Sequence, residues 1–107
     1  MTNDGQDKLL TELRNALRAH YGSRLADLVL FGSRARGEEA PDSDYDVLVV
    51  LKGTVDPRQE RRDIGDVVYK LCWEHDRVIA CHFVPLARYH GEKSPFMSNV
   101  RREGVLV

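Results

Sequence analysis

Hydrophobic residues follow two different spacings along the chain, and this predicts a mixture of helices and strands. Leucine and alanine residues of segment 6–21 recur at helical intervals, so a first helix is expected there. Segments 25–31 and 45–51 are short, almost continuous apolar runs, which is typical of buried strands. Segment 77–84 is a third run of this kind. The chain therefore predicts a small sheet built from strands that are distant in sequence.

Two helix-start signals complete the predicted order of elements. Asp56 is followed by Pro57 and then by an apolar stripe at helical spacing, so Asp56 is the expected N-cap. Ser94 and Pro95 open a last helix that is expected to end at Gly104. The order helix, strand, strand, helix, strand, helix predicts an α/β fold of the α+β kind, a small mixed β-sheet with helices packed against it. Whether the last three residues add an edge strand is left open.

Length and composition indicate an ordinary folded domain. A chain of 107 residues predicts a single domain, 1–107. The contents of 42% hydrophobic and 31% charged residues exclude a disordered or fibrous chain. The polar start gives no signal peptide, and the longest apolar run, 47–51, is too short to cross a membrane. Cys72 and Cys81 lack the spacing of a metal pair and suit a reducing compartment, so a cytoplasmic protein is expected.

Charge and aromatic patterning disfavour a nucleic-acid partner. The formal net charge is −1, and the arginines of segment 58–62 are interleaved with acidic residues, as on a solvated helix face. Trp73, Tyr89 and Phe96 are not spaced as a row on which bases would stack. The polar chemistry that stands out lies instead at the ends of the first two strands.

Asp44 and Asp46 are separated by one residue at the start of the second predicted strand. Strand side chains alternate, so both carboxylates are expected on one face, with Cα atoms about 6.5 Å apart. Two neighbouring carboxylates repel one another unless a cation lies between them, and oxygen ligands of this kind suit Mg²⁺ shared with substrate phosphates. The competing interpretation of this pair alone is a solvated strand end.

A glycine turn follows the first strand. Gly32 permits a sharp turn, and Ser33 is expected at the start of a short helical turn whose N–H groups and hydroxyl could hold a phosphate. Arg34 and Arg36 could add positive charge beside that phosphate. Alone this segment is typical of a plain turn. Together with the carboxylate pair it predicts a site for a nucleoside triphosphate and Mg²⁺ (or Mn²⁺).

These two segments resemble the signature of the polymerase-beta-like nucleotidyltransferase superfamily. The resemblance rests on Gly32-Ser33-Arg34-Ala35-Arg36-Gly37 and Ser43-Asp44-Tyr45-Asp46-Val47-Leu48-Val49. The short chain is similar to the minimal nucleotidyltransferases, which are often paired with HEPN-domain proteins in toxin–antitoxin modules. The resemblance implies the polymerase-beta-like fold.

The resemblance also implies a reaction. Ser33 would hold the outer phosphates, Asp44 and Asp46 would bind Mg²⁺, and a nucleotidyl group, with ATP as the expected donor, would move to a protein or small-molecule acceptor. A HEPN-type partner is the implied acceptor or binding partner. A chain of this length has no separate acceptor domain, so the acceptor would come from a partner or from another copy, which leaves homo-oligomers open.

The third predicted strand departs from the family pattern. The family carries a third carboxylate there, whereas this strand contains no acid, and the expected register places Ala80 or, one step along, His82 at that position. His82 could act as a substitute ligand or base, or it could be an ordinary half-buried strand histidine. Whether the chain is an active enzyme is therefore open, and the alternative is a catalytically degenerate module that binds a nucleotide or a partner.

Overall fold

The computed structural model describes residues 4–32, 34–35, 37 and 44–107. Helices and strands are intermixed along the chain, as the sequence predicts. Their order is α1 (Asp4–Tyr21), η1 (Gly22–Arg24), β1 (Leu25–Phe31), β2 (Tyr45–Leu51), α2 (Pro57–His75), β3 (Ile79–Pro85), α3 (Leu86–Gly91), α4 (Pro95–Glu103) and β4 (Val105–Leu106).

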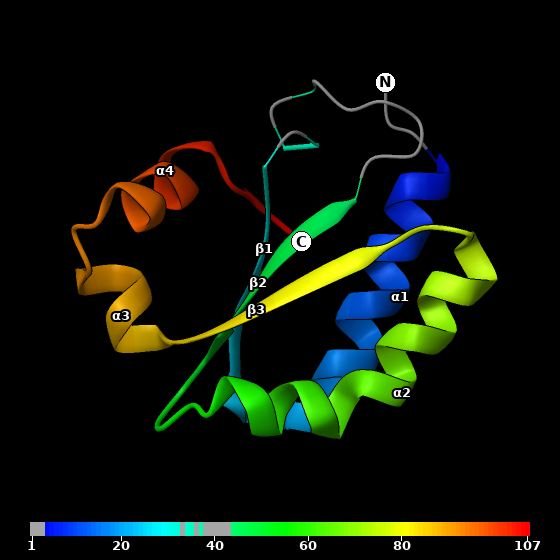
Figure 1. Ribbon diagram of the computed structural model, residues 1–107, viewed down its shortest axis with the longest axis horizontal. Helices are drawn as coiled ribbons and strands as arrows, with labels where there is room; N and C mark the ends of the chain where they lie inside the picture. Colours follow the sequence, from blue (N-terminus) through cyan, green and yellow to red (C-terminus); the bar gives the residue numbers. More distant parts are fainter. Residues whose placement is uncertain (1–3, 33, 36, 38–43) are drawn as a thin grey trace.

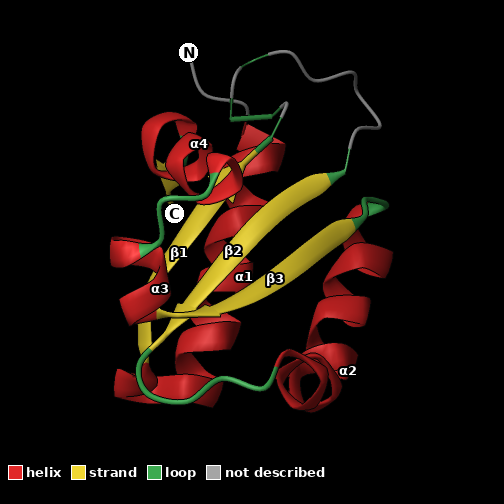
Figure 2. Cartoon of the chain, turned by 60° about the vertical axis from the view of Figure 1, so that its left-hand side comes forward, coloured by secondary structure: helices red, strands yellow, loops and turns green. Residues whose placement is uncertain are grey.

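The strands form one mixed sheet in the order β3-β2-β1-β4. Figure 2 shows β2 between β1 and β3. β1 runs antiparallel to both β2 and β4, whereas β2 and β3 are parallel and are connected through α2. A parallel pair needs such a crossover, because a tight turn can only reverse the chain. The predicted mixed sheet with packed helices is confirmed.

Helices cover both faces of this sheet (Figure 1). α1 and α2 pack on one face and α3 and α4 on the other, and β2 supplies alternate residues to each side because its side chains alternate. The α1/α2 face receives Val47, Val49 and Leu51; the α3/α4 face receives Leu48 and Val50. The residues of β2 from Val47 onward are fully buried, which explains why their sequence is apolar without alternation.

Hydrogen bonds at both ends determine where α2 begins and ends, and those at its start are the predicted N-cap. The side chain of Asp56 accepts hydrogen bonds from the backbone N–H groups of Arg58 and Gln59, which confirms the N-cap. At the other end Asp76 has the left-handed conformation (φ 53°), and the N–H of Arg77 donates to Cys72 O. These bonds hold Arg77 to the helix end, so β3 begins at Ile79, two residues later than predicted.

Two short elements near the C-terminal end were not predicted. α3 follows β3 directly, and it has too few residues to show helical spacing in the sequence. β4 answers the question that the sequence left open: Val105 and Leu106 pair with Leu30 and Val29 of β1. The predicted last helix is confirmed as α4, and the Ser94 hydroxyl accepts from the N–H of Met97 as its N-cap.

Candidate functional site

The glycine turn and the carboxylate pair meet where β1 ends and β2 begins. Phe31 and Asp46 are direct partners across the two strands, and Gly32 follows with a positive φ of 80°. A Cβ atom at Gly32 would lie 2.6 Å from Asp46 Oδ2, closer than real Cβ contacts allow. Only glycine therefore fits here, both for its backbone conformation and because the carboxylate occupies the space.

Asp44 and Asp46 supply the oxygen atoms of this region. Asp44 is exposed immediately before β2, and Asp46 is half-buried within it, on the α3/α4 face of the sheet. Within the part of the chain that the structure describes, neither carboxylate has a hydrogen bond or ion pair with another residue. The described residues contain no group of three histidine, cysteine or acidic side chains able to hold a metal ion. A pair of carboxylates fits Mg²⁺ when substrate phosphates and water complete its coordination.

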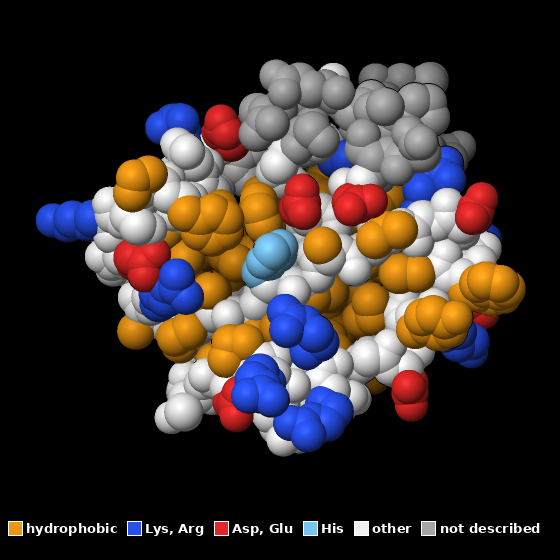
Figure 3. Space-filling model, in the orientation of Figure 1, with side chains coloured by type: hydrophobic (Ala, Val, Ile, Leu, Met, Phe, Trp, Pro, Cys, Tyr) orange, Lys and Arg blue, Asp and Glu red, His pale blue; other side chains and the backbone are white. Residues whose placement is uncertain are grey.

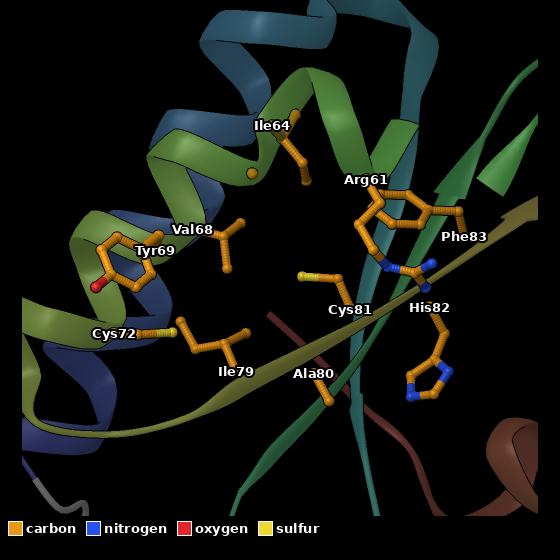
Figure 4. A pocket seen from close by; sticks show the side chains of 11 residues that line it. Arg61, Ile64, Val68, Tyr69, Cys72, Ile79, Ala80, Cys81, His82 and Phe83 are labelled. Carbon is orange, nitrogen blue, oxygen red and sulfur yellow. The ribbon is translucent and has the colours of Figure 1, made fainter. Parts of the chain in front are cut away.

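The parallel register of β2 and β3 determines which residue lies beside Asp46. Asp46 pairs with Ala80, and Leu48 pairs with His82. Ala80 and His82 point away from α2, whereas Cys81 points toward it (Figure 4). Ala80 is therefore the neighbour of Asp46 on the same face, and His82 is one pleat farther along. The structure contains no carboxylate at the position where the sequence analysis expected the third family acid.

The remaining predicted phosphate-binding residues have different surroundings. Ser33 and Arg36 lie outside the described residues. Arg34 is buried, with its guanidinium carbon 4.0 Å from the centroid of the Tyr45 ring. Tyr45 precedes Asp46 and faces the α1/α2 side, so Arg34 lies on the other side of the sheet from the Asp46 carboxylate. The structure thus places the Arg34 guanidinium against the Tyr45 ring, and contact of Arg34 with phosphate stays a prediction.

An aromatic cluster on the carboxylate face was missed by the sequence analysis. The Phe31 ring lies 5.3 Å from the His82 ring and 5.6 Å from the Phe96 ring, between centroids, and both contacts are edge-to-face. The three residues come from β1, β3 and α4, so no local sequence pattern joins them. The surface shows acidic side chains close to an exposed histidine, with a hydrophobic area to one side (Figure 3).

A hollow of about 390 Å³ lies between α2 and β3 (Figure 4). Its lining is mainly apolar and contains no carboxylate, and the side chains of Cys72 and Cys81 both point into it. Burial raises the pKa of Cys81 to about 12, so this thiol stays protonated at neutral pH. The hollow opens on the α2 side of the sheet, away from the Asp46 carboxylate, so it does not form part of the carboxylate site.

A nucleotidyltransferase domain family matches residues 10–101, which includes the glycine turn, both acids and every strand except β4. The chain belongs to this family. A curated relative, "Putative protein adenylyltransferase MJ0604" of Methanocaldococcus jannaschii, is 43% identical over 51 residues. That match spans 48% of this chain and about half (49%) of the relative.

Solved structures of low sequence identity share the fold of this nucleotidyltransferase domain. One chain comes from a toxin–antitoxin complex with AMP-PNP; the TM-score is 0.60 at 19% identity, covering 87% of this chain and 68% of that one. Another matching chain comes from the complex of a tri-AMPylated Shewanella oneidensis HEPN toxin with an MNT antitoxin. Its TM-score is 0.51 at 20% identity, covering 95% of this chain and 67% of that one. No helix in the described part of our chain is long and apolar enough to cross a membrane.

Proposed function

We propose that this nucleotidyltransferase domain transfers an adenylyl group from ATP to a hydroxyl group of a partner protein, at a site built on Gly32, Asp44 and Asp46. The observation that supports this most directly is the contact between Gly32 and the Asp46 carboxylate. It brings a turn whose backbone can approach a phosphate against an acid that has no hydrogen-bond or ion-pair partner among the described residues. A triphosphate and a divalent cation complement these two features.

Each group has a distinct part in the reaction. The acceptor oxygen would form a bond to the α-phosphorus of ATP, the bond from that phosphorus to the bridging oxygen would break, and pyrophosphate would leave. Asp44 and Asp46 would hold Mg²⁺, which when bound supplies charge neutralisation to the phosphates and lowers the barrier to in-line displacement. Gly32 and Ser33 would hold the outer phosphates, and the proton of the acceptor hydroxyl would pass to water or to a nearby base.

The proposed acceptor is a HEPN-type partner protein. The named relative bears the description "Putative protein adenylyltransferase", and one structural neighbour comes from a complex that contains an AMPylated HEPN toxin. ATP as donor and two free cysteines also suit a cytoplasmic location.

Label transfer tests the proposed function. The purified chain is incubated with Mg²⁺, ATP labelled at the α-phosphate, and a HEPN-type protein as acceptor. We expect label on the acceptor and an equal amount of released pyrophosphate. Label that stays on ATP, with the chain folded and the partner bound, would contradict adenylyl transfer.

A degenerate binding module is the second candidate, and Ala80 favours it. The residue beside Asp46 has no carboxylate, so an ion at the attacking oxygen would have fewer anionic ligands than the family pattern provides.

Ala80→Asp tests whether the absent carboxylate limits turnover, because neighbouring strands are about 4.8 Å apart and the new carboxylate would reach the Asp46 ligand set. We expect faster pyrophosphate release, about tenfold or more, and lower stability without Mg²⁺ because three carboxylates would repel one another. Ala80→Asn is the matched uncharged control. Equal rates of pyrophosphate release by Ala80→Asp and Ala80→Asn would contradict the assignment of position 80 as the place of the third carboxylate.

A further inference from the structure

Phe31, His82 and Phe96 form a continuous aromatic surface beside the proposed phosphate and metal site. Phe31 lies in the middle, with edge-to-face contacts to His82 at 62° and to Phe96 at 88° between ring planes. Phe31 is the cross-strand partner of Asp46, so the side chains start about 5 Å apart on the same face. The aromatic surface therefore begins next to the acid that would hold the metal.

Two of these rings are open to solvent. His82 is exposed, and Phe96 is 44% exposed although α4 buries Met97 completely and Val100 almost completely. Phe96 also borders a hollow of about 220 Å³ between the end of β1 and α4, lined by Phe31, Gly32, Phe96, Asn99, Val100 and Glu103. This hollow continues from Gly32, where the phosphates would lie, to the exposed phenyl ring. A flat apolar group connected to a phosphate would fit it.

We propose that Phe96 and His82, backed by Phe31, are the surface on which the nucleobase of the bound triphosphate stacks. This inference rests on the proposed function, since it assigns the base end of the same nucleotide. Aromatic side chains bind every base through its π-face and make little use of hydrogen bonds. The surface accordingly adds affinity for any nucleoside triphosphate and contributes little choice among bases.

The contacts of His82 favour this stacking role over a role as a metal ligand. His82 pairs with Leu48, one pleat beyond the Asp46–Ala80 pair, which is about 6.5 Å along the strand. Its ring lies against the edge of Phe31. Stacking needs an aromatic ring and no titratable nitrogen, whereas a ligand or base needs the nitrogen. Replacement of His82 by phenylalanine therefore separates the two roles.

The test measures binding of two ligands by calorimetry in Mg²⁺: ATP, and inorganic tripolyphosphate, which has the phosphates and no base. We expect the native chain to bind ATP more tightly. Phe96→Ala and His82→Ala should each weaken ATP binding about 5- to 10-fold and change tripolyphosphate binding less than twofold. His82→Phe should retain native ATP affinity from pH 6 to pH 8. Trp73→Ala, a truncation of an aromatic residue that is 78% exposed on α2, is the control and should change neither affinity.

Each contrary outcome identifies what has failed. Equal native affinities for ATP and tripolyphosphate, or equal weakening of both by Phe96→Ala, would overturn the stacking surface and leave the phosphate site in place. Loss of ATP binding in His82→Phe would instead show that the imidazole nitrogen is required. A native chain that binds neither ligand would overturn the proposed function, and the stacking surface with it. Melting temperatures of all variants verify that the fold is intact.

Discussion

At the scale of single residues, Gly32 is the most constrained position of the site. Its positive φ and the nearby Asp46 carboxylate both exclude a side chain. The sequence indicated a turn that needs glycine, and the structure adds that the carboxylate itself occupies the space. That second reason could not be predicted, because it depends on how β1 and β2 pair.

Gly32→Ala tests this constraint. We expect weaker MgATP binding and a loss of stability of about 1–3 kcal/mol, because alanine would be strained at this φ and its Cβ would displace the Asp46 side chain. Gly37→Ala is the matched control, since Gly37 has a similar φ (75°) and a Cβ there would meet nothing within 4 Å. Urea unfolding and calorimetry of both variants measure the difference. Equal effects on MgATP binding in the two variants would contradict the steric role of Asp46.

At the scale of elements, a buried charge ties the start of α2 to the segment after α1. Glu60 is 5% exposed, and its carboxylate accepts hydrogen bonds from both terminal nitrogens of Arg24, at 3.2 and 2.8 Å, and from the Tyr21 hydroxyl at 3.2 Å. Such a two-point contact satisfies a carboxylate that would otherwise be costly to bury. No sequence pattern predicts it, because its partners are more than thirty positions apart.

Arg24→Ala is expected to destabilise the fold by about 2 kcal/mol, because it leaves the buried carboxylate without its counter-ion. The double variant Arg24→Ala with Glu60→Gln should be less destabilised than Arg24→Ala alone, since no buried charge is then stranded. Urea unfolding of the native chain, both single variants and the double variant measures this coupling. Strictly additive losses would show that the pair contributes nothing beyond its separate side chains.

The interface of α2 with β3 makes a second prediction at this scale. Burial raises the pKa of Cys81 to about 12 from an ordinary value near 9, so the thiolate is scarce at pH 8. We therefore expect iodoacetamide to modify Cys81 more slowly in the folded chain than in urea, with a rate that still rises with pH above 9. Mass spectrometry of the labelled peptides in a Cys72→Ser background gives these rates. A folded-state rate that levels off near pH 9 would contradict the raised pKa.

The same raised pKa has a consequence for stability. The folded chain holds the Cys81 proton more tightly than the unfolded chain does. The contribution of the protonated Cys81 thiol to the free energy of unfolding is therefore complete below pH 9 and is lost as the pH rises toward 12.

At the scale of the whole molecule, the two central strands were predicted residue for residue. Helices cover both faces of β1 and β2, so their sequences are apolar runs; Gly32 follows the first run and Asp44 precedes the second. For β3 the sequence named Ala80 or His82 as the residue beside the acids, and the structure pairs Ala80 with Asp46; that β2 and β3 run parallel was not predicted. The aromatic cluster and β4 could not be predicted, since each depends on chain segments that meet only after folding.

The decisive measurement is adenylyl transfer to the HEPN-type acceptor by the native chain and by Asp46→Asn, assayed side by side with labelled ATP and Mg²⁺. Asparagine preserves the size of the side chain and removes the charge that would hold the ion. We expect Mg²⁺-dependent transfer by the native chain, no transfer by Asp46→Asn at an unchanged melting temperature, and native rates for Asp66→Asn, a control on the exposed face of α2. Transfer by Asp46→Asn at the native rate would contradict the assignment of the carboxylate site.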